Sequence, residues 1–310
     1  MQEITALVLS SGRSAVELAL FILLPIMIVM LSLMRWLEVR GILQRVVALL
    51  TPLLKPFGLT GLGIFAMIQV LMVSFAAPIA TLAMMDRNGA SQRHIAATFA
   101  MVLALAQANV VFPMASVGLE IAPTLMVALA GGLTAAAITY YGFGRRLSND
   151  ETSSGHLHSA HHRDNLLAVI RRAGKDAWDI ALGALPLLVV ALVGVKLFAL
   201  TGIIELAQSW LAPLLNIMGY PPESLVLALT KYIAGGTAMM GLAVEQFNQG
   251  LIDSQDINRL AGLLLCPLDV AGVAILIAAG PRVAAVIKPA VAGALVGILL
   301  RVVLHGWLYA

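Results

Sequence analysis

Long apolar segments fill most of the chain, and short polar stretches separate them. A helix needs about 20 apolar residues to cross a bilayer, and the segments of that length predict a series of membrane crossings. Two other apolar segments are interrupted in their middle by small residues, and an amphipathic stretch precedes each of them. The crossings are expected at 15–36, 93–118, 121–142, 177–200, 258–280 and 283–305, the interrupted segments at 60–85 and 223–244, and the amphipathic stretches at 37–57 and 203–217.

The composition supports a multi-pass membrane protein. Hydrophobic residues make up 60% of the 310 positions and charged residues only 11%, whereas soluble domains carry about 25% charged residues. The single cysteine, Cys266, excludes an internal disulfide and a metal site built from several cysteines. The net charge of +3 does not indicate a nucleic-acid partner. Glu3 stands where a signal peptide carries basic residues, so we expect the first apolar segment to be retained.

The two halves of the chain align with each other at a shift of 161 residues. TPLLKPFG at 51–58 falls on APLLNIMG at 212–219, which superimposes a proline and a glycine, and Gly89 falls on Gly250. The same shift brings the two interruptions together. The sequence therefore predicts a duplication. Its parts are a first repeat with its leading transmembrane helix at 1–142, a cytoplasmic polar linker at 143–176 and a second repeat at 177–310.

Loop charges favour a re-entrant hairpin at 60–85. Basic residues gather in 37–57 and in the linker at 143–176, whereas 203–217 contains no Lys or Arg. Cytoplasmic loops carry an excess of Lys and Arg, and both basic segments lie in the cytoplasm only if 60–85 returns to the side from which it entered. Each repeat then has three transmembrane helices, an amphipathic helix and a re-entrant helical hairpin. The odd number of crossings inverts the second repeat.

The predicted fold class is thus an all-α integral membrane protein with two inverted repeats. We expect it in the bacterial inner (plasma) membrane with both termini outside the cytoplasm. Non-helical backbone at membrane depth persists only where it is buried in protein or lines an aqueous cavity. Interrupted helices that meet near the midplane are typical of secondary transporters. The alternative is that the small residues at the interruptions serve helix packing alone, but two breaks at matching positions favour a binding site.

Two copies of one pattern resemble the nucleoside-recognition, or gate, domain. Each copy has an amphipathic segment containing PLL, then a broken segment, SFAAPIATLAMM or YIAGGTAMMGL, and then a span marked by polar residues. Concentrative nucleoside transporters, paired spore-maturation membrane proteins and the membrane half of ferrous-iron transporter B share that domain. The resemblance covers 35–142 and 196–305 and implies a site between the hairpins and the spans that follow them. The glutamate-bearing hairpin tip of the nucleoside transporters and the cysteine-bearing tips of the iron transporter are missing.

Ionisable residues inside apolar segments are few and therefore mark candidate functional positions. Asp269 falls near the middle of 258–280, on the helical face shared with Cys266, and Asn109 is the residue of the first repeat that aligns best with it. We expect Lys231 to pair with Asp269; the alternatives are a purely structural aspartate and a lysine that snorkels to the outer surface. The expected substrate-binding residues are Ser74, Thr81, Gln107, Asn109, Lys231, Tyr232, Gly235, Gly236, Thr237 and Asp269.

Most of the histidines lie in the polar linker. Clustered histidines can bind zinc or nickel, so they are the metal candidates, although a polar linker favours a solvated tether. No Walker loop, dinucleotide fingerprint, nucleophile elbow or HExxH motif is present, so the sequence predicts neither an enzyme nor a resident cofactor. The four linker histidines are His156, His158, His161 and His162.

The function predicted from these features is secondary transport of a small polar solute by alternating access. The resemblance places a nucleoside or nucleobase first, and coupling to H⁺ or Na⁺ is unassigned. The alternatives are a divalent-metal permease and a non-transporting membrane assembly or partner protein, which would need neither Lys231 nor Asp269. The expected partners are the solute, the lipid bilayer and further copies of the chain, in a homodimer or higher homo-oligomer.

Overall fold

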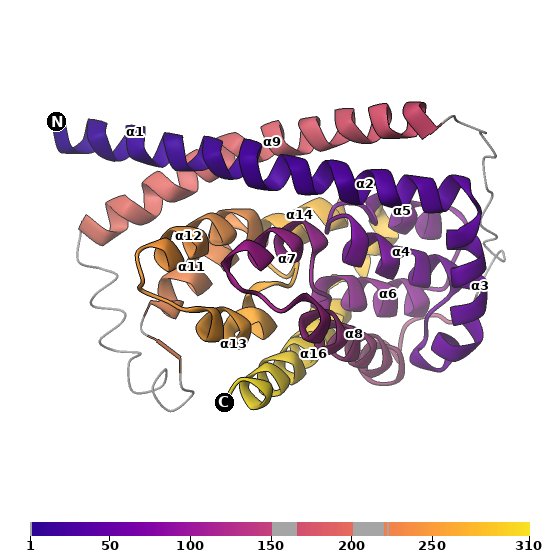
Figure 1. The fold of residues 1–310 in the computed structure, drawn as a ribbon. Coiled ribbons are helices and arrows are strands. Elements are labelled where there is room, and N and C mark those ends of the chain that lie inside the picture. The colour runs from indigo at the N-terminus through magenta and orange to yellow at the C-terminus, as the bar shows by residue number, and fades with distance from the viewer. Residues whose placement is uncertain (1, 151–165, 201–219, 222) are drawn as a thin grey trace.

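The computed structural model describes residues 2–150, 166–200, 220–221 and 223–310, and all of their regular elements are helices (Figure 1). The all-helical class is therefore confirmed for this part of the chain. The amphipathic stretch at 203–217 and the linker histidines lie outside it. The α-helices are α1 Gln2–Glu17, α2 Leu24–Val39, α3 Ile42–Leu54, α4 Gly61–Met72, α5 Ile79–Arg87, α6 Gln92–Ala104, α7 Ala108–Met114, α8 Ile121–Ile138, α9 Leu166–Leu200, α11 Ser224–Ala234, α12 Gly236–Asn248, α13 Ser254–Leu264, α14 Val270–Ile277, α15 Pro281–Ala285 and α16 Ile287–Leu308.

Several helical stretches, some of them made of consecutive helices, have the length and apolar composition needed to cross a bilayer, which makes the chain a multi-pass membrane protein. They overlap the crossings expected at 15–36, 93–118, 121–142 and 283–305, and α9 contains the crossing expected at 177–200. The qualifying stretches among the described residues are Thr5–Leu37, Gln92–Val117, Ile121–Phe143 and Ile287–Leu308.

A long helical stretch along one edge of the molecule lies beside α9 (Figure 1). It consists of α1, the π-helical turn Leu18–Leu23 and α2. The chain then turns at Gly41, whose φ of 69° lies in the left-handed region that glycine adopts without a steric penalty. This turn sends α3 away from α2, and the remaining helices build the body of the fold.

The first hairpin consists of α4 and α5, which pack against each other. The helical stretch 42–57 and α4 meet at an angle of 105°. The helical conformation ends after Met72 and resumes at Ile79, and across the hairpin the Thr81 hydroxyl donates a hydrogen bond to Gln69 Oε1 at 2.7 Å. The interruption expected within 60–85 is confirmed. In the second hairpin, Gly235 separates α11 from α12.

The helices α6, α8 and α16 contact one another at the centre of the fold. Gly131 of α8 and Gly297 of α16 bring two backbones together, because a Cβ atom added at Gly297 would lie 2.3 Å from the Gly131 carbonyl oxygen. Small residues allow this close approach between membrane helices. Residues 95–104 of α6 are all buried, so this helix is surrounded by protein.

Two of the expected crossings, 93–118 and 258–280, are not continuous helices. The first is divided between α6 and α7, and the second between α13 and α14. Pro267 explains the second break, because proline has no amide hydrogen and disfavours the α conformation of the residue before it. The first break contains neither proline nor glycine. Gln107, at the end of the first break, forms hydrogen bonds with the second break.

The breaks correct two expectations about Asp269. Its φ of −148° and ψ of 172° are extended, so it does not share a helical face with Cys266. Asp269 is instead the N-cap of α14, and the residue in the corresponding place before α7 is Gln107. Gln107, and not Asn109, is therefore the structural counterpart of Asp269.

Candidate functional site

The two broken spans meet at their breaks. The backbone N–H of Gln107 donates a hydrogen bond to the Leu265 carbonyl oxygen at 3.0 Å. The side-chain Nε2 of Gln107 donates to the Cys266 carbonyl oxygen at 3.3 Å. Backbone that leaves the helical conformation at membrane depth must find partners inside the protein. Each break thus helps to satisfy the other, and residues from both halves of the chain converge at this crossing of the two breaks.

A buried ion pair lies at this crossing. The Lys231 ammonium group on α11 pairs with Asp269 Oδ2, and their side chains are 0% and 5% exposed. Asp269 Oδ1 accepts a hydrogen bond from the Gly272 amide at 2.6 Å, which caps α14. The pairing expected from the sequence is confirmed, and snorkelling of Lys231 to the outer surface is excluded. Two buried opposite charges persist because each one has the other as its partner.

The second hairpin places its two glycines against the crossing. Gly235 has a φ of 91°, and a Cβ atom added there would lie 3.9 Å from Asp269 Oδ1. A Cβ atom at Gly236 would lie 2.3 Å from Gln107 Nε2. At Gly236 the hairpin backbone therefore approaches Gln107 more closely than a larger residue would allow. At Gly235 the positive φ is what favours glycine.

We expect Gly236→Ala to destabilise the protein by about 1–3 kcal/mol, the usual cost of forcing an extra group into a packed site. The added methyl group would push the Gln107 amide away from the Cys266 carbonyl. Gly306→Ala is the matched control, because a Cβ atom there meets nothing within 4 Å and alanine is the better helix former. Thermal unfolding of both variants in detergent measures the difference, and equal stability would contradict this account of the hairpin contact.

Arg301 on α16 holds the carboxyl ends of the two half-helices that precede the breaks. Its Nη1 donates hydrogen bonds to the carbonyl oxygens of Ala104 at 2.6 Å and Leu105 at 3.2 Å, and its Nη2 donates to that of Ala261 at 3.1 Å. Arg301 is fully buried, and no described carboxylate forms a salt bridge with it. The carboxyl end of a helix carries a partial negative charge, so two helix ends compensate this cation.

The sequence reasoning missed Arg301 and the neighbouring His305, although both stand in the apolar run LLRVVLHGWL. Both side chains are 0% exposed. Their spacing of four residues, which places them on one helical face, was the available signal. An arginine near the end of a span often reaches the membrane surface, whereas this one turns inward.

Two buried polar atoms without a protein partner in the described part of the chain lie on helices that contribute to the crossing. Among the described residues, the Asn109 Oδ1 atom and the Thr230 hydroxyl are buried and make no hydrogen bond. Asn109 lies in the first turn of α7, and Thr230 precedes Lys231 on α11. Buried groups of this kind require a partner such as water or a solute. They indicate where a polar ligand would find hydrogen bonds.

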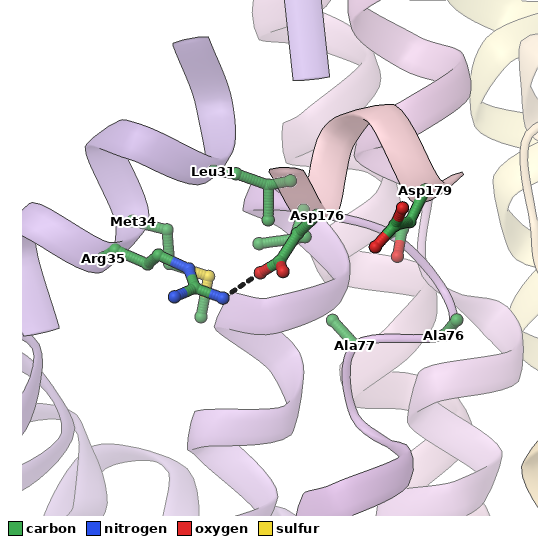
Figure 2. A pocket seen from close by; sticks show the side chains of 9 residues that line it. Leu31, Met34, Arg35, Ala76, Ala77, Asp176 and Asp179 are labelled. Carbon is green, nitrogen blue, oxygen red and sulfur yellow. Dashed lines mark hydrogen bonds and ion pairs between the residues drawn. The ribbon is translucent and has the colours of Figure 1, made fainter. Parts of the chain in front are cut away.

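The other expected residues are placed as follows. Tyr232 lies near the ion pair, with the Lys231 ammonium nitrogen 5.7 Å from its ring centre. Thr237 is half-buried in the first turn of α12, and Thr81 is occupied by Gln69. Ser74 lines a different pocket, whose lining includes neither Lys231 nor Asp269 (Figure 2).

A metal site is not assembled in the described residues. They contain no group of three or more His, Cys, Asp or Glu side chains placed to hold an ion. The four linker histidines lie outside the described part of the chain, so their role as a tether or as metal ligands stays a prediction.

Solved structures of a concentrative nucleoside transporter, CNTnw, have a similar fold. CNTnw in an inward-facing substrate-bound state gives a TM-score of 0.69 at 15% identity, over 98% of this chain and 83% of that chain. A CNTnw variant in an outward-facing state gives 0.69 at 15%, over 99% and 84%, and a variant in an intermediate state gives 0.66 at 16%, over 99% and 84%. No protein-family model matches the sequence. No curated protein matches it either.

The fold and the crossing together define a multi-pass helical membrane protein with a transporter-like fold. The structures to which the chain is similar are those of a transporter and not of an enzyme. At this level of identity the similarity concerns the fold, and the residues of the site have to be interpreted from their own chemistry.

Proposed function

We propose that the protein is a secondary transporter of a small polar solute that binds at the crossing of the two broken spans. The observation that carries this proposal is the buried Lys231–Asp269 pair beside Gln107, at a place where two interrupted helices meet. Midplane sites between interrupted helices are a recurring feature of secondary transporters. A scaffold protein would not need this arrangement of charges and unpaired polar atoms in its interior.

The chemistry of the crossing suits a neutral or zwitterionic solute with several hydrogen-bonding groups. The ion pair has no net charge, Arg301 is compensated by helix ends, and Gln107 offers a carboxamide with both donor and acceptor atoms. Asn109 and Thr230 add atoms that lack protein partners. A nucleoside or nucleobase presents matching ring nitrogens, carbonyls and hydroxyls, and it is our first candidate.

Transport would proceed by alternating access between two inverted repeats, at 1–142 and 177–310, joined by the cytoplasmic linker at 143–176. The similar order of elements in the two halves supports this division: a broken span and then a long apolar helix follow each hairpin. We place the protein in the inner membrane with both termini outside the cytoplasm, as a homodimer or higher homo-oligomer. Coupling to H⁺ or Na⁺ is left unassigned in this proposal.

Ligand-dependent thermal stability tests the proposal. A solute at 100 times its dissociation constant stabilises the folded state by about 2.7 kcal/mol, so uridine, adenosine or uracil should raise the melting temperature by several degrees. Gln107→Ala should abolish the response, whereas Gln249→Ala, on the exposed carboxyl end of α12, should keep it.

Uptake into proteoliposomes then separates transport from binding. Nucleoside uptake that Gln107→Ala removes would support the proposal. Stabilisation by divalent metal ions, lost when the four linker histidines are replaced with alanine, would favour the metal permease. A protein that responds to neither class of ligand would favour the non-transporting assembly.

A further inference from the structure

A second pocket lies between α2, α9 and the break of the first hairpin (Figure 2). We call it the hairpin pocket. Its volume is about 590 Å³, which falls within the range of about 300–1,000 Å³ typical of small-molecule sites. It shares no lining residue with the crossing of the broken spans.

The charged side chains of the hairpin pocket leave one carboxylate free. Arg35 on α2 pairs with Asp176 on α9, as the dashed line in Figure 2 shows. Asp179 lies one helical turn further along α9 and forms no ion pair or hydrogen bond with any described residue. One positive and two negative groups line the pocket, so it carries a net negative charge.

Ser74 provides an independent indication of a ligand. It stands in the hairpin break and lines the pocket, and it is only 5% exposed. Its hydroxyl makes no hydrogen bond within the described part of the chain. The hydroxyl oxygen is therefore available to hydrogen-bond a molecule in the pocket that Ser74 lines.

The rest of the lining is apolar and decides between an inorganic and an organic cation. Leu31 and Met34 on α2 and the small side chains of Ala76 and Ala77 surround the charged groups. A bare metal ion requires several close oxygen or nitrogen ligands, and the described residues contain no cluster that supplies three. Apolar walls with one free carboxylate suit a short alkyl group that carries a cationic head.

We propose that the hairpin pocket binds a small organic monocation, such as a primary ammonium ion. Asp179 accepts a charge-assisted hydrogen bond from the cationic head, Ser74 contributes its hydroxyl oxygen, and Leu31 and Met34 contact the alkyl chain. Arg35 keeps Asp176 occupied, so the pocket takes one positive charge. This site differs in place and in ligand chemistry from the solute site at the crossing, and it does not depend on it.

A reactive probe inside the pocket tests the charge preference. Ser74→Cys is introduced into the full chain together with Cys266→Ser, which removes the native thiol. The purified protein is treated with the cationic reagent aminoethyl methanethiosulfonate or the neutral methyl methanethiosulfonate, and mass spectrometry follows the modification. For each variant, the rate with the cationic reagent is divided by the rate with the neutral reagent, and this ratio is normalised to the same ratio for a free thiol in solution. We expect Asp179→Asn to lower the normalised ratio about tenfold, as the loss of one hydrogen bond to a charged group implies.

Asp150→Asn is the matched control, because Asp150 is exposed and lies outside the pocket; it should leave the ratio unchanged. n-Propylammonium chloride should slow modification of the introduced cysteine, whereas n-propanol and sodium propionate should not. Equal ratios in the Asp179 and Asp150 variants, or equal protection by propanol, would overturn the proposal. If sodium chloride at the same concentration protected the cysteine equally well, the site would not prefer an organic cation over an inorganic one, and this result would also overturn the proposal.

Discussion

Removing either member of the Lys231–Asp269 pair is expected to destabilise the protein by about 3–5 kcal/mol, because the remaining charge stays buried without its partner. Lys231→Met leaves the Asp269 carboxylate with only the Gly272 amide. Asp269→Asn leaves an ammonium group in a site that is 0% exposed. The double variant should be more stable than the less stable single variant, and unfolding of all three in detergent measures the coupling free energy.

The exposed pair Arg13–Glu17 on α1 is a matched control. Its side chains are 83% and 56% exposed, and a surface pair one helical turn apart contributes about 0.3–0.5 kcal/mol. The same set of neutralising substitutions should therefore show almost no coupling there. Strictly additive effects at Lys231 and Asp269 would show that the two charges do not depend on each other.

Arg301→Met is expected to have an effect of similar size. It removes the donors for three buried carbonyl groups, and each buried polar atom left unpaired costs about 1–3 kcal/mol. Arg301→Lys should recover only part of the loss, because one ammonium group cannot reproduce the fork with which guanidinium reaches two helix ends. Thermal unfolding of the two variants provides the measurement.

Lys288→Met is the control for Arg301, since Lys288 is an exposed cation on the same helix. It should change the stability by less than about 0.5 kcal/mol. If Arg301→Met were as stable as Lys288→Met, Arg301 would not hold the half-helices together.

The hairpins and the ion pair were predictable because the sequence carries their physical cause. Small residues and Pro78 interrupt the first hairpin, and Gly235 supplies a conformation that other residues rarely adopt. Lys231 and Asp269 are opposite charges inside apolar segments, so each required a partner. Their expected role in substrate binding stays a prediction.

Other parts of the site depend on tertiary contacts that no local pattern reveals. The sequence LAQ at 105–107 contains no helix breaker, and the break there is stabilised by a hydrogen bond to Leu265 in the other half of the chain. For the same reason the sequence alignment indicates Asn109 as the counterpart of Asp269, whereas in the structure Gln107 occupies the corresponding position before α7. Arg301 was missed because sequence does not show whether a cation near the end of a span turns toward water or toward the protein.

The position of Cys266 makes the native thiol a reporter of local opening. It is 0% exposed, and its backbone carbonyl accepts the hydrogen bond from Gln107. A thiol reagent reaches the buried sulfur only when the surrounding structure opens, so the labelling rate under native conditions reports the free energy of that opening. The unmodified protein can therefore report how often its centre opens, and how much a bound solute suppresses that fluctuation.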